Sequence, residues 1–172
     1  MISTYFHSNA IDLAMLLIRL AIGPMLIAHG YNKIFGAGGL EGTAGWFEGL
    51  GLKPGWLHAR VAAFTEISVG IAVTIGLLTP LASAGVIGLM VVAMLTDHRG
   101  KGYFVFKGGW EYVLFVAITA AALASAGPGR WSVDNAINLG WFGVRWAVVA
   151  VVLGVGAALL MLATSYRPAK KP

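Results

Sequence analysis

The chain has 172 residues, of which 58% are hydrophobic and only 11% are Asp, Glu, Lys or Arg, and its mean hydropathy is +0.80. A soluble globular domain is about one quarter charged, so this composition excludes an ordinary soluble domain and predicts an integral membrane protein. The net charge of +5 does not indicate a nucleic-acid partner, because the basic residues fall between apolar segments and form no patch on a polar face. The absence of cysteine excludes disulfides, thiol–disulfide catalysis, cysteine-ligated clusters and covalently attached c-type haem.

Five apolar segments account for most of the chain. A helix needs about 20 apolar residues to cross a bilayer, and its backbone must form its hydrogen bonds internally once it is in lipid. The alternating segments of about ten residues that build a membrane barrel are absent from the sequence. We therefore predict an all-α, polytopic transmembrane helical bundle. Its predicted spans lie near residues 12–34, 58–79, 80–97, 108–127 and 141–163.

The connections between these spans carry local signals. Only the turn at 78–80 joins the second and third spans, and Pro80 suits the first turn of a new helix. The segment near 36–57 alternates apolar and aromatic side chains with glutamates and glycines, which predicts a short interfacial helix followed by a turn. In the fifth span, the small-residue row Ala150-xxx-Gly154-xxx-Ala158 predicts a helix-packing ridge.

The lysines and arginines lie mostly on one side of the predicted bundle. Nine fall in the loops after the first and third spans and in the C-terminal segment, two fall on the other side, and Arg19 lies inside a span. The positive-inside rule then predicts a multi-pass plasma-membrane protein with its N-terminus outside, its C-terminus cytoplasmic and a basic cytoplasmic tail at 164–172. The tryptophans agree with two interfacial belts. Trp46, Trp56 and Trp110 fall at the predicted inner interface, and Trp131, Trp141 and Trp146 fall at the outer one.

Ionisable side chains within the predicted spans are the candidate functional residues. The first span, from Asp12 to Phe35, is long enough to cross a bilayer, yet it carries Arg19, His29 and Lys33. Such groups are costly in lipid and usually pair inside a bundle or serve a function. The predicted topology places several of them in the cytoplasmic half, and we infer one convergent polar cluster there. Its members are His29, Lys33, Glu66, Asp97, His98 and Glu111.

Each of these residues also has a structural interpretation. Arg19 could be satisfied by a backbone carbonyl, a carboxylate or a snorkelling path to the interface. Lys33, Asp97 and His98 lie at span ends and could simply be interfacial. His29 could be a ligand, a proton relay or a hydrogen-bonded core histidine.

Haem and metal ligation have less support. His29 and His98 both lie on the predicted inner side, so a bis-histidine haem is geometrically conceivable, but two histidines without a partner motif are no haem signature. A transition-metal site built from these histidines and Glu66 has no stronger basis. We therefore expect neither haem nor a bound metal.

Several short motifs follow one another in a fixed order over residues 13–137. They are Leu17-Ile18-Arg19-Leu20, Ala28-His29-Gly30-Tyr31-Asn32-Lys33-Ile34, Gly42-Thr43-Ala44-Gly45-Trp46-Phe47, Gly49-Leu50-Gly51-Leu52, Thr65-Glu66-Ile67, Gly76-Leu77-Leu78-Thr79-Pro80, Gly109-Trp110-Glu111-Tyr112 and Gly127-Pro128-Gly129-Arg130-Trp131-Ser132-Val133-Asp134. This set resembles the DoxX family of small bacterial inner-membrane proteins. The resemblance implies a four-helix membrane bundle within residues 1–140, to which this chain adds a fifth span at 141–163. The positions that match the family's polar pattern are Arg19, His29, Lys33, Glu66, Glu111 and Asp134.

The resemblance implies a link to respiratory or detoxifying redox chemistry. Some relatives are subunits of a thiosulfate:quinone oxidoreductase, and an actinobacterial relative associates with a superoxide dismutase and a sulfurtransferase at the membrane. The first hypothesis is therefore a redox-linked subunit that binds a quinone headgroup between helices one to four. His29 or Lys33 would donate a hydrogen bond to a quinone carbonyl, and Glu66 or Glu111 would relay protons. The full candidate pocket comprises Arg19, His29, Lys33, Glu66, Trp110, Glu111 and Tyr112.

Two other functions remain open. The basic inner loops and the fifth span also suit a non-catalytic anchor that recruits soluble redox enzymes into a membrane oxidoreductase assembly. A small-molecule or lipid transporter is the third hypothesis, although the five spans lack the inverted repeats that many transporters show.

Overall fold

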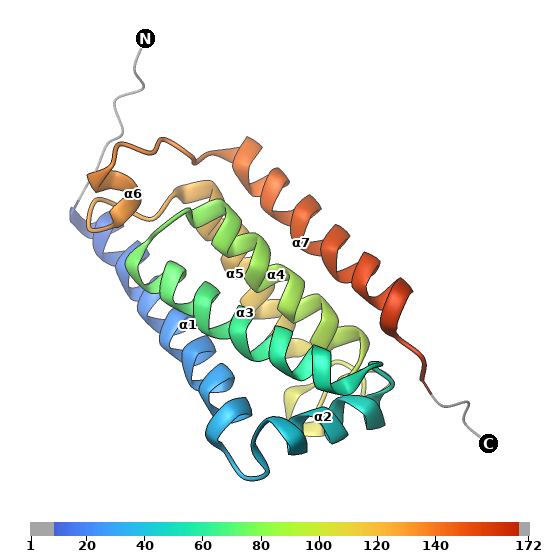
Figure 1. The fold of residues 1–172 in the computed structure, drawn as a ribbon. Coiled ribbons are helices and arrows are strands. Elements are labelled where there is room, and N and C mark those ends of the chain that lie inside the picture. Colours follow the sequence, from blue (N-terminus) through green and yellow to red (C-terminus); the bar gives the residue numbers. More distant parts are fainter. Residues whose placement is uncertain (1–8, 169–172) are drawn as a thin grey trace.

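The computed structural model describes residues 9–168, and this part of the chain is all-helical, with one isolated β-bridge and no strand ladder. Figure 1 shows the long helices lying side by side as an elongated bundle. The fold class predicted from the sequence is confirmed. The elements are α1 (Asn9–Phe35), α2 (Gly39–Leu50), α3 (Gly55–Ile75), α4 (Thr79–Leu95), η1 (Val105–Lys107), α5 (Glu111–Ala126), α6 (Val133–Ala136) and α7 (Val144–Ser165).

Three helices, α1, α3 and α7, are long and apolar enough to cross a membrane, and α4 and α5 are shorter apolar helices of 17 and 16 residues. The fourth predicted span begins later than expected, at Glu111 and not near residue 108. The cause is a left-handed glycine, Gly108, with φ 76°, which ends the short helix η1 and turns the chain before α5. A helix cannot continue through that conformation without unwinding.

Two predicted connections have counterparts in the structure. The segment near 36–57 contains the 12-residue helix α2, and Pro80 lies in the first turn of α4. The predicted basic tail at 164–172 overlaps the end of α7, which runs to Ser165, and residues 169–172 lie outside the described part of the chain.

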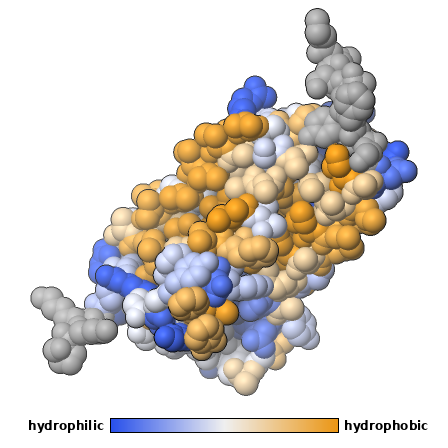
Figure 2. Space-filling view, turned by 180° about the vertical axis from the view of Figure 1, so that it is seen from behind, coloured by the Kyte–Doolittle hydropathy of each residue, from blue (hydrophilic) through white to orange (hydrophobic). Residues whose placement is uncertain are grey.

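The face of the bundle seen in Figure 2 is apolar over most of its length. Large hydrophobic side chains point outward from α1, α3, α5 and α7, and Phe64, Phe115 and Leu160 are more than 60% exposed. A soluble monomer rarely exposes contiguous apolar surface on this scale. This surface is the part of the protein that contacts the lipid bilayer.

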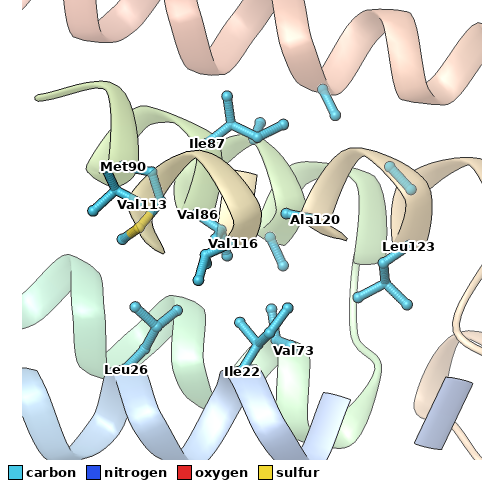
Figure 3. Packing of buried hydrophobic residues seen from close by; sticks show 14 residues of the cluster. Ile22, Leu26, Val73, Val86, Ile87, Met90, Val113, Val116, Ala120 and Leu123 are labelled. Atoms are coloured by element: carbon cyan, nitrogen blue, oxygen red, sulfur yellow. The ribbon is translucent and has the colours of Figure 1, made fainter. Parts of the chain in front are cut away.

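The core lies between two layers of helices. Figure 3 shows Ile22, Leu26 and Val73 of α1 and α3 facing Val86 and Val113 of α4 and α5. These side chains are almost completely buried and form one continuous apolar cluster with their neighbours. Helix α1 packs along α3, and α4 packs along α5, so the core joins two helix pairs.

Helix α7 packs against α4 through the predicted small-residue row. Ala150, Gly154 and Ala158 are all buried. A Cβ atom at Gly154 would lie 2.5 Å from the carbonyl oxygen of Ala84, so a side chain there would hold the two helices apart. The end of α7 is also tied to the α2–α3 turn, where the backbone N–H of Lys53 donates to the Ser165 carbonyl at 2.9 Å.

Candidate ligand-binding cavity

A cavity of about 770 Å³ lies in the part of the bundle near α2, and side chains of α1, α2, α3, α4, α5 and α7 line it. Its wall is mostly apolar and carries a small number of polar groups. Small-molecule sites in proteins typically measure about 300–1,000 Å³ and have this kind of lining. The cavity is therefore large enough for a small organic ligand.

The polar feature at the centre of the wall is an ion pair between α1 and α3. Lys33 Nζ lies 2.7 Å from both carboxylate oxygens of Glu66. The side chains are 13% and 11% exposed, so the pair is largely shielded by the bundle yet borders the cavity. A carboxylate held by both oxygens has a fixed orientation, and the pair presents one cationic and one anionic group to a ligand.

Close packing of the helices makes this pair possible. Gly30, one turn before Lys33, has no room for a side chain, because a Cβ atom there would lie 2.7 Å from the Ala63 carbonyl oxygen and 3.1 Å from Glu66 Cβ. The absence of a side chain lets α1 approach α3 near the ion pair. Thr43 of α2 then donates a hydrogen bond to the Lys33 carbonyl at 3.1 Å, which fixes the end of α1.

The cavity brings together much of the polar cluster expected from the sequence. His29 is exposed at its edge, and Tyr112 of α5 lines it and donates a hydrogen bond to Met25 Sδ at 3.1 Å. Asp97 and His98, at the end of α4, also line it. Asp97 is bonded to Lys101 at 3.3 Å, so its ion pair is separate from that of Lys33.

Two members of the expected pocket do not line this cavity. Glu111 accepts a hydrogen bond from the backbone N–H of Val105 at 3.0 Å and borders a separate hollow beside α5. Trp110 packs edge-on against Tyr103, with ring centroids 4.9 Å apart. Because Gly108 ends η1 just before α5, the carboxylate of Glu111 caps the loop and does not join Glu66.

Arg19 is also absent from the cavity and lies toward the opposite, α6 end of the bundle. It is 1% exposed, and its guanidinium donates to the carbonyl of Thr74 at 3.2 Å and to that of Trp131 at 2.5 Å. Of the partners that the sequence analysis left open, a backbone carbonyl, a carboxylate or a path to the interface, the structure gives backbone carbonyls. Gly76, in the left-handed region with φ 67°, makes room, because a Cβ atom there would lie 2.5 Å from Arg19 Nη1.

Asp134 completes this closed end of the bundle. Its carboxylate accepts hydrogen bonds from the backbone N–H groups of Leu78 and Thr79, at 2.7 and 2.9 Å, and from the Thr79 hydroxyl at 2.7 Å. The backbone N–H groups at the start of a helix such as α4 have no partner within the helix, and an anionic side chain stabilises them. Asp12 holds the same loop, because it accepts the Arg130 N–H at 2.8 Å. The segment before α6 therefore fastens α1, α3 and α4 together.

The sequence analysis did not identify His58 as a residue of the cavity. It lies in the first turn of α3, it is 7% exposed, and it lines the cavity eight residues before Glu66. At 100° per residue, the two positions are about 80° apart around α3, so they can border one space. That periodicity could have indicated His58, but it lies near the end of a span, where a histidine usually meets the interface. Among residues 9–168, no group of three or more His, Asp or Glu side chains is arranged to hold a metal ion.

The fold and the cavity define a multi-pass helical membrane protein whose bundle contains a cavity of small-molecule size. The comparison with known families then gives a specific assignment: the DoxX family matches residues 14–99, which is half of the chain, and the protein belongs to this family.

Two similar proteins extend the comparison. The chain is 27% identical over 135 residues to the uncharacterized membrane protein Rv3486 of Mycobacterium tuberculosis, covering 73% of this chain and 82% of that protein. It is also 27% identical over 135 residues to the inner membrane protein YqjF of Escherichia coli, covering 76% of this chain and 96% of that protein. No solved structure matches the chain.

Proposed function

We propose that this protein binds a quinone headgroup in the cavity beside Lys33 and Glu66 and serves a membrane redox assembly. The observation that carries the proposal is a lysine–glutamate pair held at 2.7 Å in the wall of a mostly apolar cavity of about 770 Å³. A quinone combines an apolar ring with carbonyl groups that accept hydrogen bonds. It therefore needs this combination of apolar wall and fixed donor.

The residues of the chain have distinct tasks in this proposal. Lys33 donates a hydrogen bond to one carbonyl of the headgroup while Glu66 holds the ammonium group in place. Glu66 is also the carboxylate best placed to hold or release a proton beside the ligand, because Glu111 is engaged by the loop at Val105. His29, at the exposed edge, and Tyr112 flank the ligand. When bound, the quinone supplies the electron-accepting group, and a partner enzyme supplies the electrons.

Extraction of the purified protein tests the proposal. Protein isolated in a mild detergent should carry a ubiquinone or menaquinone, detected by mass spectrometry of the organic extract. Substitution of Glu66→Gln or Lys33→Met should lower the quinone content, whereas Glu111→Gln serves as the matched control outside the cavity and should retain it. Equal quinone content in all four proteins would contradict specific binding in the cavity.

A second function, anchoring of soluble redox enzymes, is favoured by the α4–α5 loop. Phe104 and Phe106 are 51% and 77% exposed, with ring centroids 5.3 Å apart. Arg99, Lys101 and Lys107 lie in the same loop. Exposed aromatic and basic side chains are typical of protein contact surfaces. Cross-linking in native membranes should then capture an oxidoreductase in the wild type and in Glu66→Gln, but not in a Phe104→Ser, Phe106→Ser double variant. Capture of the same partner by that double variant would exclude this surface.

A further inference from the structure

The cavity contains a second polar position that the quinone proposal does not yet use. His58 Nε2 is buried, and no protein group within residues 9–168 forms a hydrogen bond with it. The residue as a whole is 93% buried, because its exposed fraction is 7%. A buried polar atom of this kind is costly unless it finds a partner, so most such atoms in proteins are hydrogen-bonded.

The cavity that His58 lines has a mostly apolar wall. Its lining includes Phe47 and Leu50 of α2, Leu52 of the turn after α2, and Met161 of α7. Phe47 and Leu52 are themselves buried and belong to one apolar cluster. The imidazole thus adds a hydrogen-bonding group to a mostly apolar wall, and a few such groups fix the orientation of a ligand in a binding site.

The position of His58 relative to the ion pair limits the shape of the ligand. Eight residues at 1.5 Å each place the backbone of His58 and that of Glu66 about 12 Å apart along α3. A ligand that contacts both His58 and the ion pair therefore needs two polar groups separated by the apolar body of the molecule. A ring with a polar group on each of two opposite sides meets this requirement.

We infer that His58 forms the second polar contact of the ligand, so that the cavity selects a ring bearing two opposite carbonyl groups over a ring bearing one. This inference rests on the proposed function, because it assigns the far end of the same site. Lys33, held in place by Glu66, donates to one carbonyl, and the imidazole of His58 donates to the other.

The test compares two probes, the dicarbonyl compound menadione and the monocarbonyl compound 1-tetralone. Binding to the full chain in detergent micelles is measured by isothermal titration calorimetry, with protein-free micelles as the blank. The variant His58→Phe removes the hydrogen bond and keeps the apolar volume. It should raise the Kd for menadione about five- to tenfold, which is the worth of one hydrogen bond, and leave the Kd for 1-tetralone unchanged. His58→Gln, which can still donate, should recover part of the menadione affinity.

The outcomes separate this inference from the proposed function. If menadione binds the wild type and its affinity depends on Glu66 but not on His58, the contact with His58 is wrong and the quinone site stands. If His58→Phe weakens both probes equally, its role is packing, and the inference is also wrong. If menadione does not bind the wild type, or if Glu66→Gln leaves its affinity unchanged, the proposed function fails and the role of His58 fails with it.

Discussion

The two ends of helix α1 use charged side chains in opposite ways. Toward the α6 end, Arg19 is fully buried, and it donates hydrogen bonds to the backbone carbonyls of Thr74 and Trp131. Toward the α2 end, Lys33 pairs with another side chain, Glu66, beside a cavity. A charge whose partners are backbone groups of neighbouring elements fixes the fold, whereas a side-chain pair beside open space can rearrange around a ligand. A charge within a membrane span therefore has no single role, because its partners decide whether it stabilises the fold or borders a site.

The largest expected effect is the loss of Arg19. Substitution to Met leaves the carbonyls of Thr74 and Trp131 without a donor in the closed end of the bundle. Because a hydrogen bond from a charged group contributes about 1.5–3 kcal/mol, we expect the free energy of unfolding to fall by about 3 kcal/mol. Unfolding by SDS in mixed micelles measures this change. Arg19→Lys keeps the charge but not the two-nitrogen geometry, so it should lower the free energy of unfolding by less. If Arg19→Met is as stable as the wild type, this side chain does not stabilise the α6 end.

The next effect concerns Asp134. Replacement by Ala removes three hydrogen bonds at the start of α4, so the free energy of unfolding should fall by about 2 kcal/mol. Its exposed neighbour provides the control, since Asn135→Ala should change stability by less than about 0.5 kcal/mol. Thermal unfolding of both variants in the same detergent gives the comparison. Equal stability of the two would mean that the start of α4 does not depend on the carboxylate.

The approach of α1 to α3 predicts a smaller loss at Gly30. A methyl group there meets the Ala63 carbonyl and Ile67, so Gly30→Ala should lower the free energy of unfolding by about 1 kcal/mol and weaken quinone retention. Gly45, in α2, has open space around its would-be Cβ atom. Gly45→Ala should therefore be neutral or slightly stabilising, because alanine favours a helix more than glycine does. Stability is measured by SDS titration, and a loss in Gly45→Ala equal to that in Gly30→Ala would refute the packing argument.

The smallest effect on stability is expected at Glu66. Lys33 lies near the end of α1 and can extend toward the interface when its partner is removed, so Glu66→Gln should change the free energy of unfolding by less than about 1 kcal/mol. Its ligand affinity should fall about tenfold, because a hydrogen bond to a charged group is lost from the site. Titration with menadione and SDS unfolding of the same preparation give both numbers. A large loss of stability without a change in affinity would place Glu66 with Arg19 as a structural residue.

Helix positions could be predicted from the sequence closely, whereas the ion pair was contained only within a predicted cluster of six polar residues. Hydropathy and length indicate the long helices α1, α3 and α7, and the polar residues on the first two spans indicated that Lys33 and Glu66 could meet. The start of α5 was predicted too early, because hydropathy does not register the left-handed turn at Gly108. The left-handed conformation of Gly108 places Glu111 beside the loop and outside the cavity, and composition does not predict such a conformation.

Two further residues, Arg19 and His58, show why the other contacts could not be predicted without the tertiary structure. Arg19 and Trp131 are 112 positions apart in the sequence, and their contact depends on how the loop before α6 folds back over α1. His58 lies near the end of a span, where hydropathy predicts an interfacial side chain. It is buried at the end of α3 against which α2 packs, and no periodicity within α3 expresses that packing.

The sequence by itself determined that this is a helical membrane protein of the DoxX type, because lipid leaves the backbone of long apolar segments no other way to satisfy its hydrogen bonds. It also determined which charged groups enter the bundle. Only the tertiary structure decided which of them share a space: close helix packing at Gly30 joins Lys33 to Glu66, while the folded loop before α6 removes Arg19 to the opposite end. Contacts between residues distant in the sequence depend on how the helices and loops pack, and the pattern of residues along the chain does not specify that packing.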